Sequence, residues 1–156
     1  MIPMSDVLTW TARQSIKGKP LLFHVAGAVL LLLVNLLFSP SFVLIGATIL
    51  VVAIALSETS WWLSVGPYGF HYRFLYGFPR RTVPCSEITS VKVVKVNTWN
   101  WGGWGRHSNM DGTGLVTGRG PGIRITRTNG KIIEASCRDE DEAATAVAVL
   151  ETHLNR

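Results

Sequence analysis

The chain has 156 residues, a net charge of +5 and a hydrophobic fraction of 47%, which leaves room for one compact domain and one further segment. The charge is uneven: residues 21–57 contain no Lys, Arg, Asp or Glu, and most charged residues follow Leu63. Because the basic residues are scattered and form no stripe, nucleic acid is not expected as a partner. The composition therefore indicates an apolar N-terminal part followed by a water-soluble part.

Residues 1–20 precede the apolar part. Ser5 or Asp6 is placed to cap a short helix that runs towards Ile16, and its apolar residues, such as Trp10, would contact lipid. We therefore expect a cytoplasmic N-terminal segment that forms an interfacial helix, with a disordered tail as the alternative.

Residues 21–62 are expected to form a transmembrane hairpin of two helices, at about 21–38 and 42–60. The first apolar run spans roughly 27 Å as a helix, close to the ~30 Å hydrocarbon core of a bilayer. Ser39-Pro40-Ser41 interrupts the helix, and so short a linker requires the second run to return antiparallel. The second run is shorter, a length also found in buried helices of globular proteins. Cleavage as a signal sequence is not expected, because a second apolar run follows at once.

His24 and Asn35 are the polar residues of the first apolar run. Polar residues within a membrane often have a function. Both lie near helix ends, however, which favours interfacial hydration or a helix–helix hydrogen bond.

Basic residues flank the two apolar runs on both sides and are missing from the turn between them. They are Arg13, Lys17 and Lys19 before the first run, and Arg73, Arg80 and Arg81 after the second. The positive-inside rule therefore predicts a multi-pass protein with both termini in the cytoplasm. Four residues are expected at the membrane interface: Lys17, Lys19, Trp61 and Trp62.

Residues 63–156 change to short alternating segments separated by turns, which is typical of strands with one buried face. The expected strands lie at about 62–65, 69–76, 80–84, 88–96, 115–117, 122–127 and 131–136. Asn129-Gly130 predicts a tight hairpin turn. The apolar set changes parity at Val93-Val94, which indicates a bulge or a strand that passes between two sheets.

A helix is expected at the end of the chain. Asp139 is placed to cap it, and Glu142 would complete a capping box. One apolar face is expected to pack on the sheet, formed by Ala143, Val147, Leu150 and Leu154. The acidic start of this helix is not expected to bind metal, because consecutive carboxylates on a helix point in different directions.

Three further stretches carry a resemblance to a known family. They are Gly77-Phe78-Pro79-Arg80-Arg81-Thr82-Val83-Pro84, then Trp101-Gly102-Gly103-Trp104-Gly105, and Gly118-Arg119-Gly120-Pro121-Gly122 before a strand, the Asn-Gly turn and the last helix. With the meandering strands, they resemble the bacterial pleckstrin-homology-like (PH-like) domains attached to transmembrane hairpins in small membrane proteins. The resemblance covers about Trp62 to Leu154. It implies a mainly-β sandwich or open barrel of about seven antiparallel strands with a C-terminal capping helix, at the bacterial inner membrane. It implies no catalytic signature.

Residues 97–122 form a long loop with an unusual composition, because they hold eight glycines and the three residues Trp99, Trp101 and Trp104. Loops of this length in small domains are often functional. The tryptophans, with Arg106 beside them, offer contact area for a membrane interface or a partner. The alternative is that they fold back and plug an open end of the barrel.

Enzymatic and redox functions find little support. The glycines lack a following Gly-Lys-Ser/Thr, so a nucleotide site is not expected. Neither a nucleophile–base set nor metal-ligand spacing is recognisable, so no catalytic residue, metal or cofactor is expected. Cys85 and Cys137 are expected as reduced structural thiols; the alternative is a cross-strand disulfide, which would conflict with a cytoplasmic domain.

The leading hypothesis is a non-catalytic interaction module at the cytoplasmic face of the membrane, where it would bind lipid headgroups, anionic ones included, or a membrane-protein partner. Its candidate contact residues are Trp99, Trp101, Trp104, Arg106, Arg80 and Arg81. The alternative is a structural subunit of a larger membrane complex. An enzyme acting on lipids or nucleotides is the least favoured hypothesis.

Overall fold

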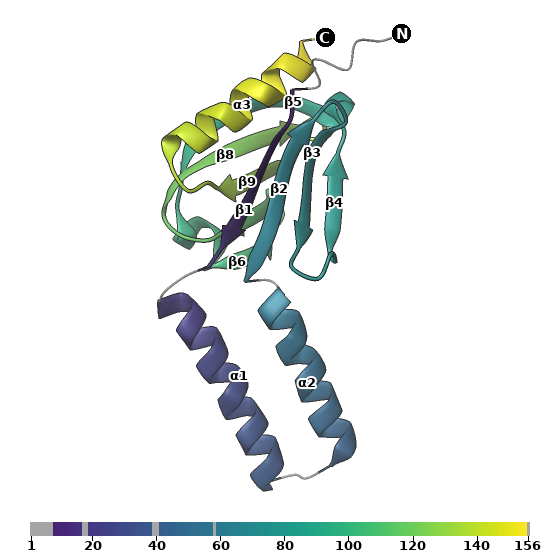
Figure 1. Ribbon diagram of the computed structural model, residues 1–156, viewed down its shortest axis with the longest axis vertical. Coiled ribbons are helices and arrows are strands. Elements are labelled where there is room, and N and C mark those ends of the chain that lie inside the picture. The colour runs from purple at the N-terminus through teal and green to yellow at the C-terminus, as the bar shows by residue number, and fades with distance from the viewer. Residues whose placement is uncertain (1–7, 17–18, 39–40, 58, 156) are drawn as a thin grey trace.

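The computed structural model describes residues 8–16, 19–38, 41–57 and 59–155, and it consists of two β-sheets, two N-terminal helices and a C-terminal helix (Figure 1). The strands are β1 (Trp10–Ser15), β2 (Ser60–Gly66), β3 (Gly69–Phe74), β4 (Arg80–Val83), β5 (Ile88–Val96), β6 (Gly105–Ser108), β7 (Gly112–Val116), β8 (Gly120–Arg127) and β9 (Ile132–Ser136). The α-helices are α1 (Lys19–Phe38), α2 (Phe42–Ser57) and α3 (Glu140–Leu154). Two short 3-10 turns, η1 (Cys85–Glu87) and η2 (Thr98–Trp101), flank β5.

The first sheet is antiparallel with the strand order β1-β2-β3-β4. The second sheet has the order β5-β8-β9-β7-β6, in which β7 and β9 pair in parallel and all other neighbours are antiparallel. The expectation of about seven antiparallel strands therefore needs correction, because β1 and β6 were not expected and one pair is parallel. The seven strands that were expected are present at β2 to β5 and β7 to β9.

The helices α1 and α2 are inserted between two neighbouring strands of the first sheet. Ser15, the last residue of β1, pairs with Ser60, the first residue of β2. The ladder extends one step further, since the backbone N–H of Ile16 donates to the carbonyl of Thr59 at 2.8 Å. The β-domain therefore begins before the helices and resumes after them, as Figure 1 shows.

The expected interfacial helix in the N-terminal segment is wrong for Trp10–Ser15, which form β1. Ala12, Gln14 and Ile16 point inward and are buried, which is the period of two of a strand. The inward position of Gln14 breaks the apolar alternation. Its amide donates to Glu142 Oε2 at 2.7 Å, so the buried polar group is satisfied.

The N-terminal helix α1 contains the segment Leu21–Phe38, which is long and apolar enough to cross a membrane, with a mean hydropathy of 2.5. None of this segment is buried within the protein, whereas the core helix of a soluble protein would be largely covered. The second apolar helix is shorter, with its apolar part at Phe42–Ile54. By length and composition, α1 could serve as a membrane anchor or as a signal sequence.

A polar contact joins α1 to α2. Asn35 donates its amide to Thr48 Oγ1 at 2.9 Å and to the carbonyl of Leu31 at 3.1 Å, and Thr48 is buried. The helix–helix hydrogen bond expected for Asn35 is confirmed. The side chain of His24 lies outside the described part of the chain.

The core lies between the two sheets and is closed by α3. The first sheet contributes the large aromatic side chains Trp61, Phe70, Tyr72 and Phe74. The second sheet contributes Leu115, Ile123, Ile125 and Ile133, and α3 contributes Ala143, Ala146, Val149 and Leu150. Of the face predicted for α3, Ala143 and Leu150 are fully buried and Val147 and Leu154 pack at its margin.

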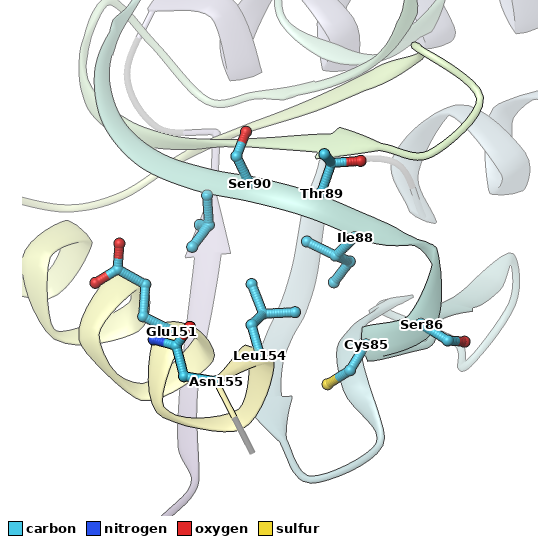
Figure 2. Close-up of a pocket in the computed structure, with 9 residues that line it drawn as sticks. Cys85, Ser86, Ile88, Thr89, Ser90, Glu151, Leu154 and Asn155 are labelled. Atoms are coloured by element: carbon cyan, nitrogen blue, oxygen red, sulfur yellow. The ribbon is translucent and has the colours of Figure 1, made fainter.

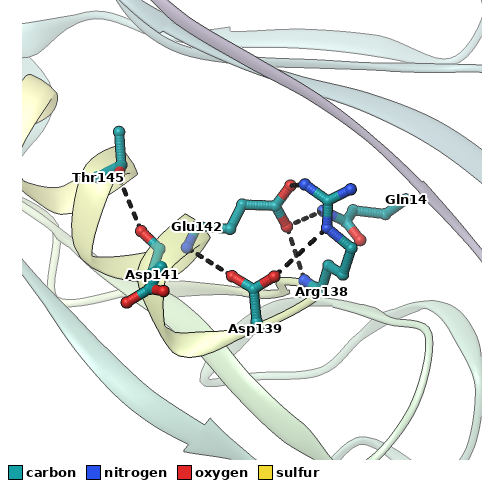
Figure 3. Close-up of polar contacts among 6 residues, drawn as sticks. All are labelled: Gln14, Arg138, Asp139, Asp141, Glu142 and Thr145. Carbon is teal, nitrogen blue, oxygen red and sulfur yellow. Dashed lines mark hydrogen bonds and ion pairs between the residues drawn. The ribbon is translucent and has the colours of Figure 1, made fainter.

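Asp139 caps the N-terminus of α3 as expected, but Glu142 accepts from the backbone N–H of Arg138, whereas the expected capping box would use that of Asp139 (Figure 3). Asp139 accepts a hydrogen bond from the backbone N–H of Glu142 at 2.8 Å. The Glu142 carboxylate accepts from the backbone N–H of Arg138 at 2.6 Å and from Gln14. This carboxylate therefore ties α3 to β1, the strand in front of the apolar helices.

Two further predictions concern β5 and the β8–β9 turn. The register of β5 shifts between Ile88 and Ser90, which is earlier than the parity change suggested. That parity change arises because β5 packs first on the main core and then, at Val94 and Val96, on a second cluster. The tight turn at Asn129-Gly130 is confirmed, with the N–H of Gly130 donating to the carbonyl of Arg127 at 2.9 Å.

Candidate functional site

The loop between β3 and β4, residues 75–79, lies on the side of the domain that faces α1 and α2 (Figure 1). Phe74 pairs with Trp61, so the chain beyond Phe74 continues past the start of β2 towards the helices. Leu75, Tyr76 and Phe78 are exposed, and Phe78 exposes 77% of its surface. We call residues 75–79 the proximal loop. Exposed aromatic and aliphatic side chains beside an apolar anchor are suited to the interfacial region of a bilayer.

A row of three arginines and one tryptophan crosses the outer face of the first sheet. The register places Arg13 opposite Trp62, Trp62 opposite Arg73, and Arg73 opposite Arg80. The guanidinium carbons of Arg13 and Arg73 lie 5.8 and 5.9 Å from the centre of the Trp62 ring. Because the ring carries negative charge on its faces, it stabilises two cations that would otherwise repel each other. We call these four residues the basic row.

The basic row lies close to the point where the helices leave the sheet. It is two residues along the strands from the Ser15–Ser60 pair, or about 7 Å at the rise of a β-strand. Three guanidinium groups and an indole therefore lie beside the ends of α1 and α2.

The positive charge of the row acts on its neighbour His71, which donates to or accepts from Thr82 Oγ1 at 2.8 Å. Burial lowers the pKa of His71 below its usual value of 6.5, and the charges of Arg73 and Arg80 lower it further. The imidazole is thus disfavoured in its charged form beside the row.

Trp61 and Trp62 differ because successive residues of a strand point to opposite faces. Trp61 was expected at the membrane interface, but it is fully buried and its ring lies 5.7 Å from that of Phe74. Trp62 exposes 36% of its surface within the basic row. Lys17 lies outside the described residues, and the side chain of Lys19 is not among those the structure describes.

The three tryptophans of the long loop have different environments. Trp101 exposes only 6% of its surface and packs with Val96 and Val116 on the outer face of the second sheet. Its indole Nε1 donates to Glu134 Oε2 at 2.6 Å. Trp101 is therefore not available as a contact residue. It folds back as the alternative interpretation expected, but onto the face of a sheet and not into an open end of a barrel. Trp99 exposes 81% and Trp104 exposes 42%, so both are available for contact.

Two of the predicted arginines meet in one pocket. Arg81 on β4 and Arg106 on β6 line a cavity of about 330 Å³ together with Arg127 and Lys131. Arg80, although adjacent to Arg81, is in the basic row and does not line this pocket. Arg127 and Lys131 were not predicted. They flank the Asn129-Gly130 turn. Basic residues on both sides of a tight turn are the sequence signal from which these two could have been predicted.

A second pocket, of about 450 Å³, lies between β5 and the C-terminal end of α3, at the end of the domain away from α1 and α2 (Figures 1 and 2). It contains one thiol, Cys85, and one carboxylate, Glu151, and no histidine or lysine is among its lining residues. The Cys85 thiol lies 3.8 Å from the carbonyl oxygen of Pro67, to which it donates.

Both cysteines are free thiols. Burial and, after it, the charges of the Glu142 and Asp139 carboxylates together raise the pKa of the Cys137 thiol to about 12. Cys137 is therefore an unreactive structural thiol. Within the described residues, no cluster of three or more His, Cys, Asp or Glu side chains is arranged to hold a metal ion.

No protein-family model matches the chain, and no curated protein matches it either. The function is therefore inferred from the insertion of α1 and α2 between β1 and β2, from the basic row and from the proximal loop.

Proposed function

We propose that this protein is a membrane-anchored PH-like interaction module, which holds its β-domain against the cytoplasmic face of the bacterial inner membrane and binds lipid headgroups there without catalysis. The observation that carries the proposal is the insertion of α1 and α2 between the hydrogen-bonded strands β1 and β2. An anchor inserted within a sheet fixes the orientation of the whole domain, whereas an anchor on a flexible tail would not.

The proposal treats α1 as a permanent anchor. Cleavage after α1 would separate β1 from the domain and would remove the buried side chains of Ala12, Gln14 and Ile16 from the fold. A segment that the core requires is unsuited to removal as part of a signal sequence.

We further propose that α2 also crosses the bilayer and that the two helices form a double-pass hairpin. Most of the large apolar side chains of both helices are exposed, which is unfavourable in water and favourable in lipid. The Asn35–Thr48 hydrogen bond links the helices where no water would compete for it. A two-helix hairpin returns the chain to the side from which it left, as the β1–β2 pairing requires.

The cytoplasmic placement is supported by the charge beside the helices. Arg13, Arg73 and Arg80 lie in the basic row next to the ends of α1 and α2, and residues 41–57 carry no basic side chain. Basic residues beside a membrane segment favour the cytoplasmic side. The same charges would attract anionic headgroups of the inner leaflet.

The PH-like assignment is supported by the strand arrangement. A four-stranded antiparallel sheet is followed by the antiparallel neighbours β5, β8 and β9 and then by α3, which packs on the sheets. These are seven strands and a terminal helix. The hairpin of β6 and β7 is then an addition at the edge of the second sheet, beside β9.

A depth measurement tests the orientation. In a background with Cys85→Ser and Cys137→Ala, Phe78→Cys in the proximal loop and Tyr68→Cys in the β2–β3 turn each receive a fluorescent label. Both positions are exposed, but they lie at opposite ends of the first sheet. After the full chain is reconstituted in vesicles, spin-labelled lipid should quench the label at residue 78 strongly and the label at residue 68 weakly. Equal quenching at the two positions would contradict a domain held in this orientation.

The second candidate is a structural subunit of a larger membrane complex, and the exposure of Trp99 favours it, because exposed tryptophans are frequent anchors of protein interfaces. Extraction in a mild detergent followed by mass measurement separates the two candidates. A single copy of the chain would count against the subunit, and a stoichiometric partner lost on Trp99→Ala would support it.

A further inference from the structure

The pocket lined by Arg81 and Arg106 lies where the two sheets separate beyond the core. Arg81 and Val83 point to the same face of β4, and Val83 is buried in the core. Arg81 therefore points into the space between the sheets, at a place that core side chains do not fill. Arg106, Arg127 and Lys131 reach the same space from the second sheet.

Four cationic side chains thus converge on a cavity of about 330 Å³, and no carboxylate lines it. Glu87 pairs with Arg127 from outside the lining. Arg81, Arg106 and Lys131 have no ion-pair partner within the described part of the chain. Like charges in a confined space repel one another, and an anion in the pocket would relieve that repulsion.

Hydrogen-bond donors remain unsatisfied around the same cavity. The Nε atoms of Arg106 and Arg127 are buried and have no acceptor among the described residues. Buried donors of this kind are rare, and they mark places where a partner is needed. An oxyanion entering the pocket would bring acceptors to the two arginines that line it.

The neutral side chains of the pocket also present donors. Asn109 uses its Oδ1 to accept from the backbone N–H groups of Asp111 and Gly112, at 2.9 and 3.0 Å. Asn129 uses its Oδ1 to accept from the N–H of Lys131 at 3.1 Å. With both amide oxygens occupied, the amide NH₂ groups are the parts left for a ligand. The pocket therefore offers donors from several directions and suits a ligand rich in acceptors.

We infer that this pocket is a binding site for a phosphate-bearing anion. A phosphate group has several acceptor oxygens and up to two negative charges, which match three unpaired cations and the surrounding donors. The cavity is larger than one phosphate, so a phosphorylated headgroup or a small phosphorylated solute would fit. The inference goes beyond the proposed membrane contact, because the basic row and the proximal loop take no part in the pocket.

The test uses the full chain in nanodiscs of phosphatidylcholine, with pyrophosphate as the soluble probe. Pyrophosphate is titrated at constant ionic strength and its binding is followed by calorimetry. We expect one site per chain. Arg81→Gln and Lys131→Gln should each weaken binding by about tenfold, since each removes a direct charge contact. Both side chains are exposed, so the variants should fold normally.

Lys95→Gln is the matched control. It removes the same charge as Lys131→Gln from an exposed lysine of β5 that lies in neither the pocket nor the basic row. It should change pyrophosphate binding by less than about twofold, because exposed charges at a distance are screened. If Lys95→Gln weakens binding as much as Lys131→Gln, general electrostatic attraction explains the result and the site is refuted.

A second arm distinguishes the source of the phosphate. Without pyrophosphate, hydrogen exchange at residues 105–113 and 127–133 is measured for the chain in nanodiscs that contain phosphatidylglycerol. It is compared with the exchange measured in nanodiscs of phosphatidylcholine. If Arg81→Gln abolishes this protection and also weakens pyrophosphate binding in the first arm, the lipid headgroup is identified as the ligand. Pyrophosphate binding without such protection identifies a soluble ligand. Neither binding nor protection would overturn the inference, and the quenching of a label at residue 78 would still report separately on the membrane orientation.

Discussion

The contact between Trp101 and Gly114 gives a prediction in which the effect of one substitution depends on the other. A Cβ atom built at Gly114 would lie 2.4 Å from the Trp101 ring, and its three nearest atoms all belong to that ring. Gly114→Ala should therefore destabilise the protein by about 1–3 kcal/mol through overpacking. Without the indole, the three contacts that crowd this methyl group would be absent.

Trp101→Ala alone should cost about 3–5 kcal/mol, the range for removing a large buried aromatic side chain. The loss includes the hydrogen bond to Glu134, which is buried and keeps its other partner, the Nε of Arg124, at 2.6 Å. In the Trp101→Ala background, Gly114→Ala should be neutral or should stabilise by up to about 1 kcal/mol, because alanine restricts the unfolded chain. The coupling energy of the pair should therefore be about 1–4 kcal/mol.

Urea unfolding of the full chain in nanodiscs, followed by far-UV circular dichroism, measures all four proteins of this cycle. Trp99→Ala and Gly118→Ala are the controls, because Trp99 is exposed and a Cβ at Gly118 meets no atom within 4 Å. Each should change the free energy of unfolding by no more than about 0.5 kcal/mol. Equal costs of Gly114→Ala with and without Trp101 would refute the proposed packing on the outer face of the second sheet.

Three further predictions follow from the fold and the titrating groups. Replacing residues 17–58 by Asn-Gly should leave a water-soluble folded β-domain, because Ile16 and Thr59 are already joined by a ladder hydrogen bond; aggregation in size-exclusion chromatography would contradict this. Cys85 should react with a maleimide at pH 8 well before Cys137, whose pKa is raised to about 12; equal rates by mass spectrometry would contradict this. Because the pKa of His71 is lower when folded than its usual 6.5, the unfolded state binds more protons, so stability should fall as pH drops through about 6.5. His71→Asn should flatten the pH dependence of the unfolding midpoint in that range.

Local patterns were sufficient to predict the elements that local sequence stabilises. The apolar composition of residues 21–38 predicted α1, Asn129-Gly130 predicted the β8–β9 turn, and Asp139 predicted the cap of α3. Each of these depends on interactions within a few residues. Of the two interpretations left open for Asn35, interfacial hydration and a helix–helix hydrogen bond, the structure shows the second, because Thr48 on the paired helix accepts from its amide.

The errors concern residues whose partners lie far away in the sequence. Gln14 occupies an inward position of β1 because Glu142, 128 residues later, accepts its hydrogen bond. Trp101 is buried because Glu134 accepts from its indole and Gly114 leaves room for its ring. Period and composition contain no information about such pairs. The burial of Trp61 could have been predicted by extending β2 backward, because Trp61 has the same parity as the buried Leu63 and Val65.

The edge strand β4 connects the two surfaces proposed to bind anions. Arg80 belongs to the basic row on the outer face of the sheet, and Arg81 lines the pocket on its inner face. Both follow directly after the proximal loop, which faces the apolar helices. A change in how deeply the loop enters the headgroup region would therefore move β4 and both arginines together. If the pocket binds a soluble phosphorylated ligand, its affinity should then depend on the lipid around the anchor, and calorimetric titrations in thin and thick nanodiscs would measure that dependence.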